Sequence, residues 1–168
     1  LAEFNQHCQN VGINILNRRL LRTYLLNSFA HFLDPKGTQL CFITSKDVNP
    51  YRRWNIENSL TIGTSIHYVG AMPFVIENFP GYQIRHVDRD KYVKQTQGTT
   101  YAWSKHKTTE LDDKVTSPQY QGEAFCSLCR AGPFATEQHR YKHIQSRKHV
   151  LMNQYEEQWR MDIQETVS

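Results

Sequence analysis

The sequence predicts an α+β fold on three observations. Apolar residues recur at three- and four-residue steps between residues 11 and 33, as in an amphipathic helix. Short β-type runs separated by Pro and Gly follow. Near the C-terminus, two cysteines precede two histidines at metal-ligand spacing. We therefore expect an N-terminal helix with short irregular strands or extended arms, then a linker, then a small zinc finger with a long C-terminal helix. The corresponding segments are 1–94, 95–122 and 123–168.

The first helix is predicted over residues 11–33. Its apolar side chains fall on one face, and all its charges are arginines. The stretch 4–33 contains Arg but no Asp or Glu, which is also the composition of a mitochondrial transit peptide. We favour instead a helix docked on a neighbour by its apolar face, because transit peptides are normally removed. The composition favours a mitochondrial location, with the nucleus as the alternative, and Leu1 in place of Met indicates a processed chain.

Several short β-type runs follow the helix, and strict alternation is weak in most of them. Gly63 marks either a bulge in a bent strand or the middle of an extended arm. The predicted strands are 40–44, 60–69, 73–76, 82–87 and 91–94.

Residues 95–122 are predicted to be a linker, because Gln, Thr, Gly, Ser and Lys dominate there. Basic and aromatic residues are interspersed between residues 91 and 109, within this linker and just before it. Cations can pair with phosphates while aromatic faces stack on exposed bases. This pattern, found also at 51–54, nominates Lys105, Lys107, Trp103, Arg52 and Arg53 as RNA contacts. The alternative is a solvated linker with scattered aromatic residues.

The clearest chemical signal is the set Cys126, Cys129, His143 and His149. A Cys-x-x-Cys turn points two thiolates at one ion, and a following helix can supply two imidazoles. His139 is a possible substitute for His149, but only nine residues separate it from Cys129, which is short for this pattern. Four such ligands leave no open position on the metal, so we expect one structural zinc ion.

The second helix is expected to begin near Thr136, because Gly132 and Pro133 interrupt the chain before it and Thr is a favourable N-cap. Residues six apart on an ideal helix lie roughly 240° apart around the axis. His143 and His149 can therefore bind one ion only if the helix opens between them, and Ser146 is the predicted place.

The segment 125–153 resembles a matrin-type zinc finger, the group that includes the finger of spliceosomal snRNP C proteins. The resemblance rests on the Cys-x-x-Cys pair, Phe134, His143 and the closing His149. It implies that the two cysteines and two histidines hold zinc. Thirteen residues, where twelve are commoner, separate the ligand pairs, and Ser146 replaces the usual Gly.

The finger helix has a basic surface, because residues 138–155 contain no acid. Such cations can bind phosphates. The residues nominated for this role are Arg140, Lys142, Arg147 and Lys148. Farther on, apolar residues at helical spacing predict a tail that packs on protein.

Composition narrows the function. The net charge of +4 favours an anionic partner. No apolar run is long enough to span a membrane, and no catalytic constellation or phosphate-binding glycine loop stands out. With two cysteines assigned to metal, Cys8 and Cys41 indicate a reducing, intracellular compartment.

These observations together predict a non-catalytic RNA-binding component of a large ribonucleoprotein, most simply a mitochondrial ribosome. Its expected partners are RNA and neighbouring proteins of the complex, and we expect no membrane and no small-molecule substrate. The alternatives are a free-standing double-stranded-RNA or DNA-binding regulator, a spliceosomal subunit, and a protein-interaction adaptor stapled by zinc.

Overall fold

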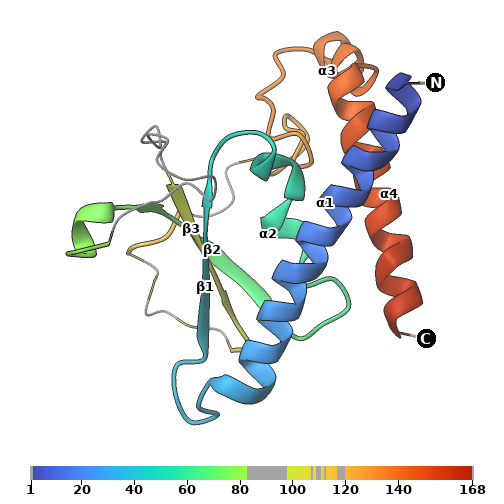
Figure 1. Cartoon of the computed structure of the whole chain (residues 1–168). Helices are drawn as coiled ribbons and strands as arrows, with labels where there is room; N and C mark the ends of the chain where they lie inside the picture. The colour runs from blue at the N-terminus through green and yellow to red at the C-terminus, as the bar shows by residue number, and fades with distance from the viewer. Residues whose placement is uncertain are drawn as a thin grey trace.

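The computed structural model describes residues 2–82, 98–106, 108, 111, 113–116 and 120–167, and of residues 2–11 and 166–167 it describes only the backbone. The fold is α+β (Figure 1). Its elements in chain order are α1 (Ala2–Asn27), the π-helical turn η1 (Ser28–Phe32), β1 (Leu40–Lys46), η2 (Tyr51–Trp54), α2 (Ile56–Ser59), β2 (His67–Phe74), η3 (Ile76–Asn78), β3 (Gly98–Ser104), α3 (Glu137–Ile144) and α4 (Arg147–Val167).

The three described strands form an antiparallel sheet in the order β1-β3-β2. The strand that comes last in the sequence is therefore central. Trp103 of β3 stands opposite Cys41 on one side and Tyr68 on the other. Residues 101–104 are all buried, as expected for a central strand covered by other elements.

The outer edge of β2 carries a bulge between Tyr68 and Gly70. A Cβ atom at Gly70 would lie 2.8 Å from the Val115 side chain, so this position needs glycine. The next residue, Ala71, exchanges two backbone hydrogen bonds with Thr116, at 2.7 and 3.2 Å. This short bridge holds residues 115–116 against the sheet, ahead of the segment that carries the two ligand cysteines.

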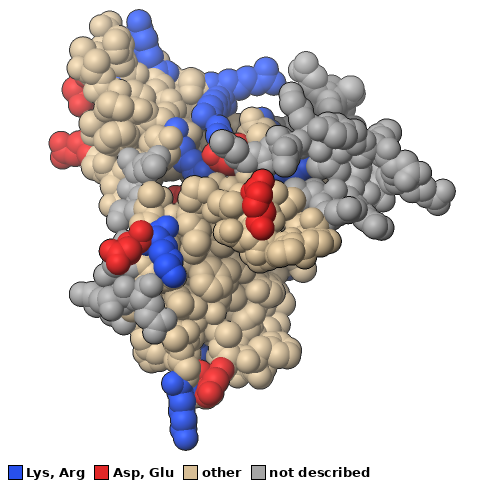
Figure 2. Space-filling model, turned by 90° about the vertical axis from the view of Figure 1, so that its left-hand side faces the viewer, with Lys and Arg blue, Asp and Glu red and all other residues tan. Residues whose placement is uncertain are grey.

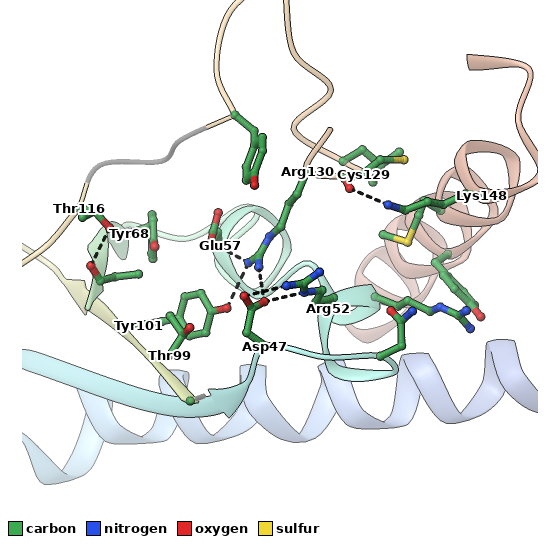
Figure 3. Close-up of a pocket in the computed structure, with 18 of the residues that line it drawn as sticks. Asp47, Arg52, Glu57, Tyr68, Thr99, Tyr101, Thr116, Cys129, Arg130 and Lys148 are labelled. Carbon is green, nitrogen blue, oxygen red and sulfur yellow. Dashed lines mark hydrogen bonds and ion pairs between the residues drawn. The ribbon is translucent and has the colours of Figure 1, made fainter. Parts of the chain in front are cut away.

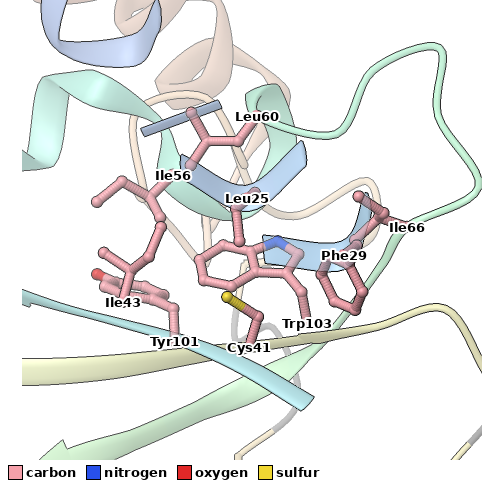
Figure 4. Packing of buried hydrophobic residues seen from close by; sticks show 9 residues of the cluster. All are labelled: Leu25, Phe29, Cys41, Ile43, Ile56, Leu60, Ile66, Tyr101 and Trp103. Carbon is pink, nitrogen blue, oxygen red and sulfur yellow. The ribbon is translucent and has the colours of Figure 1, made fainter. Parts of the chain in front are cut away.

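The main core lies between the sheet and α1 (Figure 4). Trp103 and Leu25 are both fully buried there, and burying each such side chain stabilises a fold by about 1.5–3 kcal/mol. The buried members of the cluster are Leu25, Phe29, Cys41, Ile43, Ile56, Leu60, Ile66, Tyr101 and Trp103.

The C-terminal helix α4 runs beside α1 in the same direction (Figure 1). Arg18, which is fully buried, donates to Glu156 Oε1 over 2.6 Å. Arg19 forms a second ion pair with Asp162. The predicted protein-facing tail thus packs within the chain itself, against α1 and α2. No helix in the described ranges combines the length and the apolarity that crossing a membrane requires.

Several predicted boundaries differ from the structure. Helix α1 begins near residue 2 rather than 11, and residues 60–66 form turns rather than a strand. The largest difference is β3, which lies inside the predicted linker 95–122. Its Thr- and Gly-containing sequence lacks an alternating pattern, because a strand buried on both faces does not need one. The predicted strand 91–94 and most of 82–87 lie outside the described residues.

Candidate metal centre and adjoining groove

The structure places Cys126, Cys129, His143 and His149 in position to bind a metal ion. Their ligand atoms all lie within 4.8 Å of one another. His149 Nδ1 lies 3.5 Å from the sulfur of Cys126 and 3.6 Å from that of Cys129. A tetrahedral zinc ion with bonds of about 2.3 Å to sulfur and about 2.05 Å to nitrogen separates S and N ligands by about 3.5 Å. The spacing therefore fits a tetrahedral site.

The cysteines are presented by a tight knuckle, which we define as residues 126–131. Cys126 and Ala131 exchange two backbone hydrogen bonds, at 2.8 and 3.2 Å, and close the turn. Arg130 has a positive φ of 49°, which allows the chain to reverse directly after Cys129. Gly132 follows with φ 123°, and a Cβ there would lie 2.7 Å from the carbonyl oxygen of Ala124. The local sequence thus directs both sulfur atoms to one point.

The histidines come from two helices rather than one. Thr136 caps α3 by accepting the backbone N–H of His139, as its side chain predicts. The helix ends at Ile144, and α4 begins at Arg147, with Ser146 Oγ accepting the N–H of His149. The opening predicted at Ser146 is therefore present. It turns His149 toward His143, so that their ring centroids are 5.1 Å apart.

The electrostatics of the site also fit a metal ion. Burial raises the pKa of the Cys129 thiol to about 12, and Cys126 adds to the rise, so this sulfur needs a cation beside it to be present as the thiolate. Burial and the neighbouring His149 lower the pKa of His143, which favours the neutral imidazole that a metal needs. Among the described residues, no group hydrogen-bonds the buried His143 Nε2, and a metal ion would supply the missing partner. The predicted alternative His139 is exposed and lies outside this group.

Arg130 connects the knuckle to the sheet domain (Figure 3). Its guanidinium donates to Glu57 Oε1 over 2.7 Å, to Tyr101 Oη over 3.2 Å and to Asp47 Oδ1 over 3.3 Å. Arg52 contacts the same Asp47 carboxylate at 2.7 and 2.9 Å. Three residues, Asp47 directly after β1, Glu57 of α2 and Tyr101 of β3, thus contact one side chain of the knuckle.

A groove of about 1500 Å³ lies around this cluster, between the sheet, the knuckle and the start of α4. Figure 2 shows Lys and Arg side chains gathered in the upper half of the molecule, over the hollow between its upper and lower parts, with acidic side chains among them. The charged residues of the groove lining are Asp47, Arg52, Arg53, Glu57, Glu77, Arg130, Arg147 and Lys148, and its aromatic residues are Tyr68, Phe74, Tyr101, Tyr120 and Tyr155.

The predicted RNA contacts are not all in one place. Four of them line the groove: Arg52, Arg53, Arg147 and Lys148. Arg140 and Lys142 lie on α3, and Lys105 sits over the ring of Phe29 at 5.9 Å. Lys107 lies outside the described residues.

Trp103 requires a correction. It is fully buried at the centre of the sheet, so its ring is not available to stack on a base. The linker prediction had placed it in a solvent-exposed segment.

Sequence reasoning also missed the groove residues Asp47, Glu57 and Arg130. A basic residue directly after the second cysteine was the one available hint. Its partners lie 73 and 83 residues earlier in the chain, which no local pattern reveals.

Comparison with known proteins gives one family. Residues 4–86, just under half of the chain, match the family model described as rRNA (uridine-N3-)-methyltransferase BTM5-like. No curated protein and no solved structure matches the chain. The matched segment holds α1, β1, η2, α2, β2 and η3, and so includes Asp47, Arg52, Arg53 and Glu57 of the groove.

This match corrects the identity predicted from the sequence. The family found is not the matrin-type zinc finger, and its model covers none of residues 125–153. It also describes an enzyme, so the predictions of a non-catalytic ribosomal or ribonucleoprotein component, and of its regulator, spliceosomal and adaptor alternatives, are wrong. Those predictions relied on the finger, because the first 120 residues showed no catalytic pattern. The mitochondrial location is not tested and stays a prediction.

Proposed function

We propose that this chain takes part in the methylation of uridine N3 in ribosomal RNA, and that the described residues bind the RNA in the groove beside the metal centre. The observation that carries the proposal is the family match over residues 4–86, which form one wall of that groove. The knuckle and the first turn of α4 form the other wall.

The groove has the chemistry that an RNA strand requires. Arg147 and Lys148 stand in the first turn of α4, where the helix dipole also favours phosphate. Arg52 and Arg53 face the groove from η2. Tyr68 is half-buried in the lining and offers a ring on which a base can stack. Cations on two walls and aromatic rings between them suit a strand with exposed bases.

We further propose that the metal is a single zinc ion with a structural role. Two thiolates and two imidazoles are the ligands zinc prefers, and four of them fill its tetrahedral shell. Because four protein ligands leave no coordination position for water, zinc in this site would supply no nucleophile. Its contribution is to hold the knuckle, α3 and the start of α4 in one arrangement, and structural zinc in small fingers stabilises folding by about 10–16 kcal/mol.

Methyl transfer also requires a methyl donor, and the described residues do not fit one. Nucleoside cofactors are commonly held by a glycine-rich loop after a strand and by a carboxylate on the ribose. No such loop follows a strand in the described part of the chain. The groove carboxylates Asp47 and Glu57 are already engaged by Arg130.

The test has two arms. The first measures fluorescence anisotropy of labelled ribosomal RNA fragments with the zinc-loaded protein. Arg147→Ala/Lys148→Ala should weaken binding and reduce the dependence of log K on log salt by about two, one for each lost phosphate contact. Arg160→Ala is the matched control, because Arg160 is exposed on α4 and does not line the groove.

The second arm incubates the protein and RNA with S-adenosylmethionine and measures N3-methyluridine by mass spectrometry. Methylated uridine that depends on Arg147 and Lys148 supports both parts of the proposal. RNA binding without methylation would overturn the catalytic part, and absence of RNA binding would overturn the proposal as a whole.

A further inference from the structure

We propose that Arg130 makes RNA binding in the groove depend on the metal centre, by masking the carboxylates of Asp47 and Glu57 only while the knuckle is held closed. This inference rests on the proposed function. It assigns Arg130 a positioning role, because the residue acts through the two acids rather than by contacting a base.

The position of Arg130 depends on the knuckle. It directly follows the ligand Cys129, and its backbone N–H donates to Ser127 over 3.3 Å. Its left-handed φ of 49° is unfavourable for a residue with a side chain and persists only where the surroundings impose it. Two backbone hydrogen bonds between Cys126 and Ala131 supply part of that constraint, and ligation of Cys126 and Cys129 to one ion adds to it by tying both sulfur atoms to a single point. Loss of the ion leaves the turn with the two hydrogen bonds alone.

The two acids depend on Arg130 to different degrees. Asp47 keeps a second cation, since Arg52 binds the same carboxylate. Glu57 pairs with Arg130 at 2.7 Å, and its side chain is only 16% exposed. When Arg130 leaves, this half-buried carboxylate loses the ion pair that compensates for its burial. Both acids lie in the lining of the groove, where an uncompensated negative charge repels phosphate.

The small net charge of the groove lining makes RNA binding sensitive to the position of Arg130. Of the residues that the structure describes, five cations and three acids line the groove, so the excess of positive charge is small. Arg130 is one of the five and covers two of the three acids. Its release therefore lowers the cationic charge of the groove and uncovers Glu57 in one step. Zinc-loaded protein should bind RNA, and metal-free protein should bind it weakly even where the sheet remains folded.

The first test is Arg130→Ala in the zinc-loaded protein. All four metal ligands remain, so zinc content should stay at one per chain, while RNA affinity should fall about tenfold. Arg160→Ala removes a cation from α4 outside the groove and controls for net charge. Unchanged RNA affinity in Arg130→Ala would overturn the inference, while RNA binding by the wild-type protein would leave the proposed function standing.

The second test removes the acids instead. In Asp47→Asn/Glu57→Gln there is no negative charge for Arg130 to mask. Chelation of zinc also releases the start of α4, which carries Arg147 and Lys148, so it should weaken RNA binding in both proteins, but by about tenfold more in the wild type than in this variant. Circular dichroism and the tryptophan emission, to which buried Trp103 contributes together with Trp54 and Trp159, verify that the sheet is folded in each sample. An equal effect of the chelator on both proteins would show that the metal acts on RNA binding without Arg130, and would overturn the inference.

Discussion

Trp159 of α4 donates its indole N–H to the backbone carbonyl oxygen of Ser59 over 2.9 Å, and both residues are fully buried. The bond joins the C-terminal helix to α2, whose Ile56 belongs to the main core next to the sheet. The ring of Trp159 packs in the interior, and its single N–H donor is hydrogen-bonded, as is usual for buried tryptophans.

The contribution of this bond can be isolated with Trp159→Phe. The substitution keeps an aromatic ring but leaves the Ser59 carbonyl without its donor, which costs about 1–3 kcal/mol. Urea denaturation should show a loss of this size, with an additional loss from the smaller ring. Gln158→Ala at the neighbouring exposed position should change stability by less than about 0.5 kcal/mol. Equal stability of the two variants would contradict the packing of α4 described above.

The ion pair between Arg18 and Glu156 is buried, and removal of one partner should be costly. Glu156 also accepts from Asn55 over 3.1 Å. Burial lowers the pKa of Arg18, and Glu156 opposes that effect. Glu156→Ala leaves a buried cation unpaired and should destabilise the chain by about 3–5 kcal/mol in denaturation experiments. Glu156→Gln keeps an acceptor and should lose less, and Glu157→Ala, at an exposed position, should be close to neutral.

Asp47 should contribute to the acid sensitivity of the fold. The hydrogen bond from Arg52 is the main cause that holds the pKa of Asp47 below its ordinary value of 3.8, against an opposing effect of burial. Its stabilising effect is therefore complete above that value and is lost as the pH falls through it toward the folded-state pKa. The stability difference between wild type and Asp47→Asn should be present at pH about 6 and shrink toward pH about 3. Asp113→Asn removes one acid at an exposed site and serves as the control for the change in net charge.

The choice of histidine ligands can be tested by metal content. His143→Ala removes a buried ligand atom and should abolish stoichiometric zinc binding, measured by inductively coupled plasma mass spectrometry after dialysis. His139→Ala, one turn earlier and exposed, should retain one zinc per chain. Loss of zinc in the His139 variant with retention in the His143 variant would reverse the assignment.

Features that depend on residues close together in the sequence could be predicted, and features that depend on residues far apart in the sequence could not. The two ligand cysteines, the start of α3 at Thr136 and the opening at Ser146 all follow from neighbours within one or two turns of chain. The place of Trp103 does not, because its strand partners Cys41 and Tyr68 come from distant segments. The groove could not be predicted for the same reason, because its residues are far apart in the sequence. Nothing near Arg130 in the sequence indicates that Asp47 and Glu57 lie beside it.

The family match carries information that the residue pattern did not. It falls on residues 4–86, where the sequence offered an apolar helix and ambiguous strands. The matched segment contributes Asp47, Arg52 and Glu57 to the groove, and the residues around the metal centre form the rest of the same surface.

The pairing of α1 with α4 also determines the order in which the chain can fold. Arg18 and Glu156 are 138 residues apart in sequence, and contacts of such separation form late because their loop closure is entropically expensive. During synthesis, α1 would leave the ribosome before α4, so Arg18 would lack its ion-pair partner Glu156 until α4 is made. A fragment that ends near residue 86 lacks Glu156, the ion-pair partner of Arg18, and Trp159, the donor to the Ser59 carbonyl, so we expect it to remain incompletely folded. We therefore expect that the segment matched by the family model needs the C-terminal helix to reach its native packing.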